Sequence, residues 1–295
     1  MSGAHAPVAP SRPLLAALWI AGAILCFSGM TVAGRELWAE LDTFEIMFYR
    51  SAVGLPIVAF LMWRSLGWRG ARTQAPAQHL ARNVIHFAAQ NLWFFGIATI
   101  PLAQLVALEF TNPLWVALLA PLFVGERLTS AKLGAAAIGF LGVLVIARPG
   151  VSPLEWGHAA ALGAALGFAV TNLFTKRLSR RDAELTVLFW MTFSQMLMGL
   201  ACAAPGGIAL PSQPLWPWVG FIGLAGLGAH YCLTRALYVA PASVVAPMEF
   251  ARLPVIAALG LFLYGEPLEL ALLLGAALIL AGNALNIRAE RKRRV

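Results

Sequence analysis

The sequence predicts an all-α integral membrane protein of ten transmembrane helices, built as two inverted five-helix repeats with both termini in the cytoplasm. Three observations support this: an apolar composition, a segment that recurs 140 positions later, and an uneven distribution of basic residues among the loops. Of the 295 residues, 60% are hydrophobic and 12% are charged, and the mean hydropathy is +0.77, far from the balance of soluble domains. The composition therefore indicates a chain that lies in a lipid bilayer.

The first half contains five apolar segments. Residues 1–13 form a short Pro- and Ala-rich stretch, which we expect to be a cytoplasmic tail. A spanning helix needs about 20 mostly apolar residues, and the charged and Pro- or Gly-rich breaks separate segments that meet this need. Their predicted ranges are 14–34, 44–63, 80–97, 102–124 and 133–147. The first is long and has no clear Ala-x-Ala cleavage site, so we expect it to be a retained span and not a signal peptide.

The second half contains five more segments by the same criteria. The first half closes at Arg148-Pro149-Gly150, and the predicted spans that follow are 157–173, 185–204, 216–236, 242–264 and 270–287. A basic run, RAERKRRV, ends the sequence. The predicted organisation is therefore a first repeat over residues 14–147, a second over residues 148–288, and a basic cytoplasmic tail over residues 289–295.

An internal repeat relates the two halves, because the segment 101–128 recurs at 241–268. The matched residues include Pro101 and Pro241, Glu109 and Glu249, Gly125-Glu126 and Gly265-Glu266, Gln90 and His230, and, with a shift of 141, Arg35 and Lys176. Each half has an odd number of predicted spans, so the second half is inverted relative to the first. Inverted repeats are typical of secondary transporters, whose substrate site lies near the bilayer midplane.

Basic residues are concentrated in alternate loops. Most of the 21 Lys and Arg residues, including Arg82 near the start of the third span, lie on the side of the N-terminus. The opposite loops hold only Arg35 and Arg148, while Arg50 and Arg252 lie within spans. The positive-inside rule therefore places both termini in the cytoplasm. The net charge of +8 is explained by topology, and we predict no nucleic-acid partner.

The sequence offers no set of residues for catalysis or metal binding. The three cysteines lie in apolar stretches, and an odd number supports neither a disulfide framework nor a metal cage, so buried small side chains are the simpler interpretation. No phosphate loop, nucleotide-binding fingerprint, metal-ligand spacing or Ser-His-Asp set is present in the sequence. We therefore predict a protein that is not an enzyme and needs no cofactor or metal.

Short motifs resemble those of a known family. The second span contains Phe48-Tyr49-Arg50, and Gly-Glu-Arg-Leu and Gly-Glu-Pro-Leu close the fourth and ninth spans. With ten apolar spans, this pattern resembles the EamA family of the drug/metabolite transporter superfamily over essentially the whole chain, and is most similar to the YddG-type amino-acid exporters. The resemblance implies two EamA units, a bacterial inner-membrane location, export of small metabolites, and peripheral fifth and tenth spans.

Polar side chains within spans are costly, so they are the candidates for lining a cavity. His86, Gln90 and Trp93 are four and three residues apart and share one helical face. The second half offers a similar stripe, and Gln90 and His230 correspond under the repeat. That stripe consists of His230, Thr234 and Tyr238, with Tyr231 alongside it, and the candidates among these are His230, Tyr231 and Thr234. The alternative is hydrogen bonding between helices, worth about 1 kcal/mol each.

Glu109 and Glu249 each lie about 12 Å into a span, at 1.5 Å per residue. One interpretation is a cavity role, in which an unpaired carboxylate takes up a proton and couples it to transport. The other is structural ion pairing with Arg50 and Arg252, and Arg252 is close enough in sequence to compensate Glu249 locally. The sequence leaves both interpretations open.

The remaining candidates are weighed one by one. Arg50, next to Tyr49 in the family motif, has a planar fork suited to a substrate carboxylate. Asn112, Trp115 and Asn172 are weaker candidates, because a Trp in a span is as well explained by packing. Glu126 and Glu266 end their helices, where a carboxylate needs a basic or amide partner, and are predicted to fix loops.

Together these observations predict a transporter that exports small metabolites by alternating access around a central cavity formed by spans 1–4 and 6–9. Amino acids, with aromatic or apolar ones favoured, are the predicted cargo, because aromatic faces are mixed with Arg, His and Gln side chains able to orient a zwitterion. The alternatives are another small metabolite, an amphipathic cation, an intramembrane enzyme, or a scaffold that transports nothing.

Overall fold

The computed structural model describes residues 12–124, 128–148, 155–240 and 242–294. The predictions for the N-terminal tail and for Glu126 fall outside these residues. The described residues form twelve α-helices and three short 3₁₀ helices, with no β-strand among them. Most helices follow the predicted spans and extend beyond them by a few residues at one end or both.

The helices of the first half are α1 (Pro13–Leu37), α2 (Thr43–Leu66), η1 (Trp68–Ala71), α3 (Pro76–Thr99), α4 (Leu102–Glu109), α5 (Asn112–Val124) and α6 (Ser130–Ala147). Those of the second half are α7 (Trp156–Leu178), α8 (Glu184–Ala203), η2 (Ala204–Gly206), η3 (Gln213–Leu215), α9 (Trp216–Val239), α10 (Ala242–Glu249), α11 (Arg252–Tyr264) and α12 (Leu270–Arg294). Capping residues set some of these boundaries. Asp42 and Glu45, for example, form a reciprocal capping box at the start of α2.

Two predicted spans are broken, so the expectation of one continuous helix over residues 102–124 and one over 242–264 was wrong. In the first half, Pro113 has no N–H to offer the carbonyl of Glu109, and the N–H of Thr111 bonds instead to Leu108 at 3.0 Å. The second half has the same tightened turn, with Ala251 bonded to Met248 at 3.1 Å. The breaks leave the two glutamates of the repeat at the ends of α4 and α10.

Seven described helical segments are long and apolar enough to cross a membrane, and α3 is not among them. The low hydropathy of α3 comes from polar side chains, and these are buried in the protein interior. His79, Arg82, Asn83, His86 and Gln90 are all less than 9% exposed. A helix in this position turns its polar face inward, toward other helices, because lipid would leave those groups without hydrogen-bond partners.

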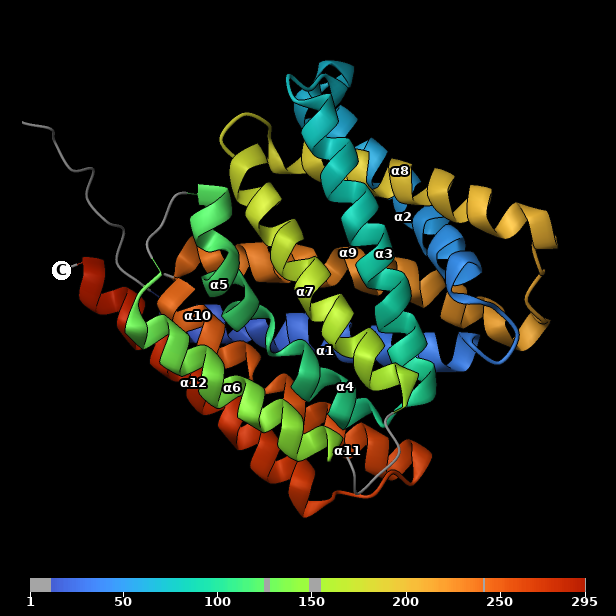
Figure 1. Ribbon diagram of the computed structural model, residues 1–295. Coiled ribbons are helices and arrows are strands. Elements are labelled where there is room, and N and C mark those ends of the chain that lie inside the picture. The colour runs from blue at the N-terminus through green and yellow to red at the C-terminus, as the bar shows by residue number, and fades with distance from the viewer. Residues whose placement is uncertain (1–11, 125–127, 149–154, 241, 295) are drawn as a thin grey trace, which may run out of the picture.

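The two halves interlock. The most extensive helix–helix contacts are α6 with α12, α1 with α9, α3 with α7 and α2 with α8, and each pair joins one helix from each half. Figure 1 shows α6 and α12 running side by side along one edge of the bundle. A Cβ on Gly142 would lie 2.5 Å from the carbonyl oxygen of Gly275, so the backbones of α6 and α12 meet without side chains between them.

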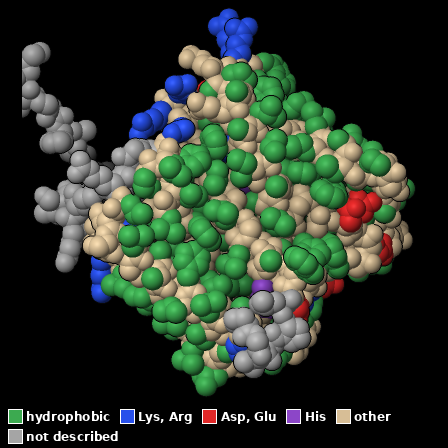
Figure 2. Space-filling view, in the orientation of Figure 1, with side chains coloured by type: hydrophobic (Ala, Val, Ile, Leu, Met, Phe, Trp, Pro, Cys, Tyr) green, Lys and Arg blue, Asp and Glu red, His purple; other side chains and the backbone are tan. Residues whose placement is uncertain are grey.

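The outer surface is largely apolar. Large hydrophobic side chains such as Leu14, Leu122, Phe262 and Leu270 are more than 70% exposed. Figure 2 shows hydrophobic side chains over most of one face, with basic side chains gathered toward one end of it and acidic ones toward another. Such a surface is stable in lipid, because its exposed apolar side chains contact hydrocarbon and not water. The protein is therefore a multi-pass integral membrane protein.

Candidate functional site

A cavity of about 290 Å³ lies between the two halves. Its walls are formed by α1, α2 and α3, by the broken segments α4/α5 and α10/α11, and by α7, α9 and α12. Ten of the fourteen candidate residues line it: Arg50, His86, Gln90, Trp93, Glu109, Asn112, Asn172, His230, Glu249 and Arg252. The fold thus gathers most of the candidates in one place, while their action on a substrate stays a prediction.

Four candidates do not line this cavity. Tyr49 donates a hydrogen bond to the carbonyl of Ala209 at 2.8 Å, and Thr234 donates one to Glu184 at 2.6 Å. The other two are Trp115, packed edge-on against Phe140 with ring centroids 4.7 Å apart, and Tyr231, which is 58% exposed. Tyr49 and Tyr231 directly adjoin cavity residues in sequence, and neighbouring positions of a helix project in different directions.

One ion pair joins the halves at the broken helices. Arg252 Nη2 lies 2.6 Å from Glu109 Oε1, and the indole of Trp93 donates to the other carboxylate oxygen at 2.9 Å. The Arg252 guanidinium also lies 5.1 Å from the ring centroids of Phe27 and Phe110, within the range of cation–π attraction. The pair lines the cavity as well, so Glu109 is both ion-paired and at the cavity surface, while a role in proton coupling stays a prediction.

Glu249 has no such partner. Arg252 makes its ion pair with Glu109, and it acts on the Glu249 carboxylate only through the longer-range electrostatic attraction that the sequence predicts. Among the described residues, no hydrogen-bond donor or cation pairs with the Glu249 carboxylate, which also lines the cavity. The two glutamates that the repeat relates therefore have different environments, and the symmetry of the sequence is broken at this point.

Another wall of the cavity is basic. We call Arg50, Arg82, His86 and His230 the basic wall. Arg50 is 7% exposed, and its nearest polar contact is Gln195 Oε1 at 3.5 Å. Arg82 donates to Thr175 at 2.8 Å and to Asn83 at 2.9 Å, both neutral acceptors. Within the described part of the chain, neither arginine has a carboxylate partner.

Sequence reasoning missed Arg82 as a cavity residue and counted it only as a topology signal. It also missed the hydroxyl of Thr171 and the aromatic residues Phe27, Phe110, Phe168 and Phe250. A signal existed for Arg82, because it precedes His86 by four residues and so lies on the same helical face as His86, Gln90 and Trp93. The repeat, which matches Phe27 with Phe168 and Phe110 with Phe250, is a weak signal for these rings, since apolar aromatic residues occur throughout the spans.

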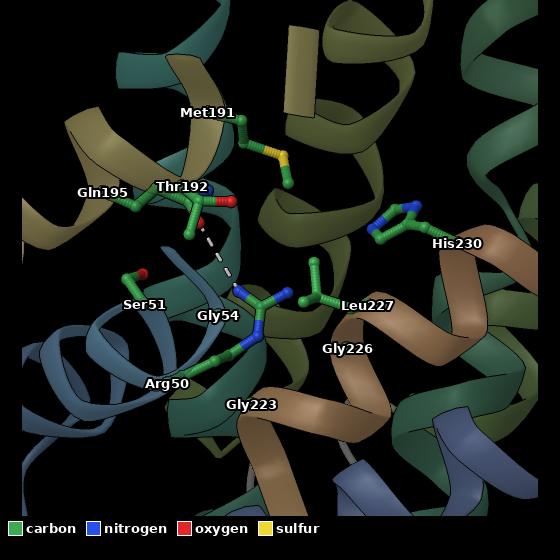
Figure 3. Close-up of a pocket in the computed structure, with 10 residues that line it drawn as sticks. All are labelled: Arg50, Ser51, Gly54, Met191, Thr192, Gln195, Gly223, Gly226, Leu227 and His230. Carbon is green, nitrogen blue, oxygen red and sulfur yellow. Dashed lines mark hydrogen bonds between the residues drawn. The ribbon is translucent and has the colours of Figure 1, made fainter. Parts of the chain in front are cut away.

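A second, much smaller pocket adjoins the basic wall. It has a volume of about 10 Å³ and is lined by residues of α2, α8 and α9, including Ser51, Thr192 and Gln195. Figure 3 shows the Arg50 guanidinium between Gln195 on one side and His230 on the other. Arg50, Gly226 and His230 border both this pocket and the central cavity.

A polar cluster around Arg35 joins helix ends of the two halves. Its guanidinium bonds to Glu266 at 2.8 Å and to the carbonyls of Ile97 and Ile100 at 2.7 Å each. The second oxygen of Glu266 accepts from the N–H of Leu102 at 2.8 Å, which caps the start of α4. The predicted need of Glu266 for a basic or amide partner is thus met by Arg35.

Interlocked halves, paired broken helices and a polar central cavity are the architecture of a secondary membrane transporter. Residues 14–148 and 155–288 each match the model of the EamA-like transporter family. The chain belongs to the EamA-like transporter family. The chain is similar to a solved structure with a TM-score of 0.64 and 21% sequence identity, and the match covers 95% of this chain and 99% of the other. This similarity supports the same fold.

Characterised relatives extend over nearly the full length of the chain. It is 31% identical to the riboflavin transporter of Rhizobium johnstonii, over 97% of this chain and 95% of the relative. It is 28% identical to the riboflavin transporter of Vibrio cholerae, over 96% of both chains. The S-adenosylmethionine uptake transporter of Rickettsia bellii is 22% identical, over 93% of this chain and 94% of its own. These names lend no support to the predicted amino-acid cargo or to export.

Proposed function

We propose that the chain is an inner-membrane transporter of ten spans that moves a riboflavin-like aromatic heterocycle by alternating access. Counting α4 with α5 and α10 with α11 as one broken span each yields ten spans from twelve helices. An even number of spans and the concentration of basic residues in alternate loops support cytoplasmic positions for both termini. In this proposal the first repeat contains α1–α6, and the second contains α7–α11 and α12 up to residue 288.

The observation that carries this proposal is the mixed lining of the central cavity. Aromatic rings line it from both halves: Phe27, Trp93, Phe110, Phe168 and Phe250. The amides of Gln90, Asn112 and Asn172 lie on the same surface. A flavin presents a planar ring for stacking and a polar edge for hydrogen bonds, and such mixed linings are typical of small-molecule sites. The volume of about 290 Å³ is at the lower end for such sites.

The two sides of the bundle differ in a way that supports alternating access. The cavity includes Arg82, Asn172 and Ile287, which lie near the predicted cytoplasmic ends of their spans. The opposite side is packed by Leu37, Ile97, Ile100 and Leu102, each at most 2% exposed, and is tied by Arg35 to Glu266. We interpret this arrangement as a state closed toward the outside.

A second candidate substrate is favoured by the charges of the cavity. Among the described residues Arg50 has no carboxylate partner and Glu249 makes no ion pair, although Arg252 attracts it at longer range, and both line the cavity. A molecule carrying a carboxylate and a cation would compensate both. S-adenosylmethionine and amino acids share that pattern, so the predicted amino-acid cargo remains an alternative on this ground.

Transport by the purified protein in liposomes tests the proposal. We expect labelled riboflavin to enter these vesicles faster than empty ones and to leave preloaded vesicles, which measures both directions. Gln90→Ala is expected to weaken apparent affinity about fivefold, the value of one hydrogen bond, while Gln213→Ala on the exposed η3 leaves it unchanged. Flux of S-adenosylmethionine or amino acids without flavin flux would overturn the riboflavin assignment. If none of these compounds is transported, both the riboflavin assignment and the alternative substrates are rejected.

A further inference from the structure

Arg50 is a buried cation without a counter-ion. Its contacts are Gln195 Oε1 at 3.5 Å and Met47 Sδ at 3.9 Å, both long and both neutral, and its Nε has no hydrogen-bond partner. The described residues provide no carboxylate that pairs with it. A guanidinium held in this way within a membrane protein is costly, and such groups normally face a partner or a water-filled path.

Other polar groups next to Arg50 are also unsatisfied. Ser51 Oγ and Gln195 Nε2 are buried without a partner, and both side chains line the small pocket beside Arg50. That pocket has room for about one water-sized group. A hydroxyl, an amide and a guanidinium thus converge where the described structure supplies no negative charge, and an incoming oxyanion would accept from all three.

The backbone of α9 is adapted to the guanidinium. A Cβ on Gly226 would lie 2.9 Å from Arg50 Nε and 3.0 Å from Nη2, so only a glycine leaves the planar group this close to the helix. Figure 3 shows Gly226 and Leu227 of α9 beside the guanidinium. Gln195 lies on one side of the guanidinium and His230 on the other. The position of Arg50 therefore depends on the absence of a side chain at residue 226.

Arg82 adds a second positive charge at the same surface. Arg50 and Arg82 both act electrostatically on His86 and His230. Neither ring nitrogen of His86 has a hydrogen-bond partner, although the side chain is only 6% exposed. The carboxylates of the cavity, Glu109 and Glu249, lie at the broken helices, where Glu109 is already paired with Arg252.

We propose that Arg50, with Ser51, Gln195 and the basic wall, forms an anion subsite that holds a carboxylate or phosphate group of the transported molecule. This inference rests on the proposed function for its ligand: the subsite gives anionic members of the proposed substrate class additional affinity, while neutral riboflavin occupies the central cavity without it. On a flavin the group is a phosphate ester, and on an S-adenosylmethionine-like molecule it is the α-carboxylate. One oxygen reaches the small pocket, while the rest of the ligand stays in the central cavity.

The test compares ligands that differ by one anionic group. Riboflavin is paired with flavin mononucleotide, and S-adenosylmethionine with its decarboxylated analogue, as competitors of binding to the purified full-length protein. If a ligand pair binds, we expect the affinity of its anionic member to be at least about tenfold higher than that of the other member, which is the value of a charge-assisted hydrogen bond. Arg50→Gln should remove this preference, and the exposed Arg64→Gln on the same helix should retain it.

Two further variants separate charge from geometry. Arg50→Lys keeps the charge but loses the bidentate fork, so an intermediate preference is expected. Gly226→Ala displaces the guanidinium and should weaken the anionic ligand more than the neutral one. Gly220→Ala is the matched control on α9, because a Cβ there meets nothing within 4 Å.

Stability of the ligand-free protein distinguishes a binding role from a structural one. Because Arg50→Gln removes an unpaired buried charge, its melting temperature should equal or exceed that of the unchanged protein. The proposal is overturned if Arg50→Gln melts lower, if it weakens both members of a ligand pair equally, or if the unchanged protein shows no anionic preference.

Two other results separate the remaining explanations. If inorganic phosphate or chloride alone stabilises the protein as much as flavin mononucleotide does, and only when Arg50 is present, the site holds a free inorganic ion and the substrate assignment falls. If neither flavin binds but the S-adenosylmethionine pair shows the preference, the riboflavin assignment fails and the anion subsite stands.

Discussion

Glu109 shows how one side chain serves both packing and the cavity. Its carboxylate is bound by Arg252 from the other half and by the Trp93 indole, and the pair is 16% and 9% exposed at the two side chains. Glu109→Gln leaves the Arg252 cation without its counter-ion, so we expect a loss of about 3 kcal/mol of stability. Thermal unfolding in detergent, compared with the unchanged protein, measures this loss.

The double variant Glu109→Gln/Arg252→Gln removes both charges and should recover most of that stability. Glu269→Gln is the control, because it breaks the much more exposed Arg148–Glu269 pair, for which less than about 1 kcal/mol is expected. A Glu109→Gln protein as stable as this control would show that the central pair contributes little.

Asp182, in the loop between α7 and α8, predicts an acid-dependent loss of stability. Burial acts to raise the pKa of Asp182, but hydrogen bonds with Thr73 and His79, at 2.6 and 2.7 Å, and the charges of His79 and Arg181 outweigh it, so the pKa is lowered. A lowered carboxylate pKa stabilises the fold at pH values above the unfolded pKa of about 3.9, and this contribution is lost as the pH falls through the folded pKa.

Asp182→Asn should therefore melt lower than the unchanged protein at pH 6, and the difference should shrink on acidification toward pH 3. Melting curves in detergent at a series of pH values measure it. A difference that stays constant across the series would assign the effect to hydrogen bonding alone.

At the scale of elements, the Arg35–Glu266 cluster ties α1 to the start of α4 and to the loop after α11, and we propose that it closes one side of the cavity. Glu266, in the loop after α11, forms an ion pair with Arg35 of α1 and also accepts a hydrogen bond from the first N–H of α4. Glu266→Gln keeps the size of the side chain but removes its charge, so we expect faster hydrogen–deuterium exchange at residues 97–105. Glu269→Gln, three residues away, should leave that segment unchanged, and equal exchange in both variants would argue against a closing role.

The α6–α12 contact depends on glycine. Gly142→Leu puts a side chain where the carbonyl of Gly275 lies, and overpacking of this kind costs about 1–3 kcal/mol. Gly134→Leu is the matched control on the same helix, because a Cβ there meets nothing within 4 Å. Melting temperatures of the two variants should differ clearly, and similar values would mean that α6 and α12 adjust freely.

For the whole molecule, the topology of the chain is open to a direct test. Reporter domains that are active only in the cytoplasm should be active when fused at residue 295, and inactive when inserted after residue 268, between α11 and α12. The reason is that basic residues are retained in the cytoplasm, and alternate loops lie on opposite sides. Activity at residue 268 and none at residue 295 would reverse the proposed orientation.

Particular residues show how far the sequence reaches. The repeat, the stripe of His86, Gln90 and Trp93, and the cost of polar side chains within spans together led to ten of the residues that line the cavity, because these signals can be read from the sequence alone. Arg82 was missed because the charge count treated it as a topology signal. Tyr49 and Thr234 were misplaced because their partners, Ala209 and Glu184, are distant in sequence.

The sequence by itself determined the membrane class, the helical architecture, the two-repeat organisation and the family, because apolar spans, a duplication and terminal motifs are local patterns. Only the tertiary structure decided that Glu109 pairs with Arg252 while Glu249 and Arg50 have no counter-ion among the described residues. Pairing of buried charges depends on distances across the interface between the halves, which the sequence does not contain. An alignment of the two repeats therefore implies that Glu109 and Glu249 are equivalent, whereas the folded chain gives them different environments.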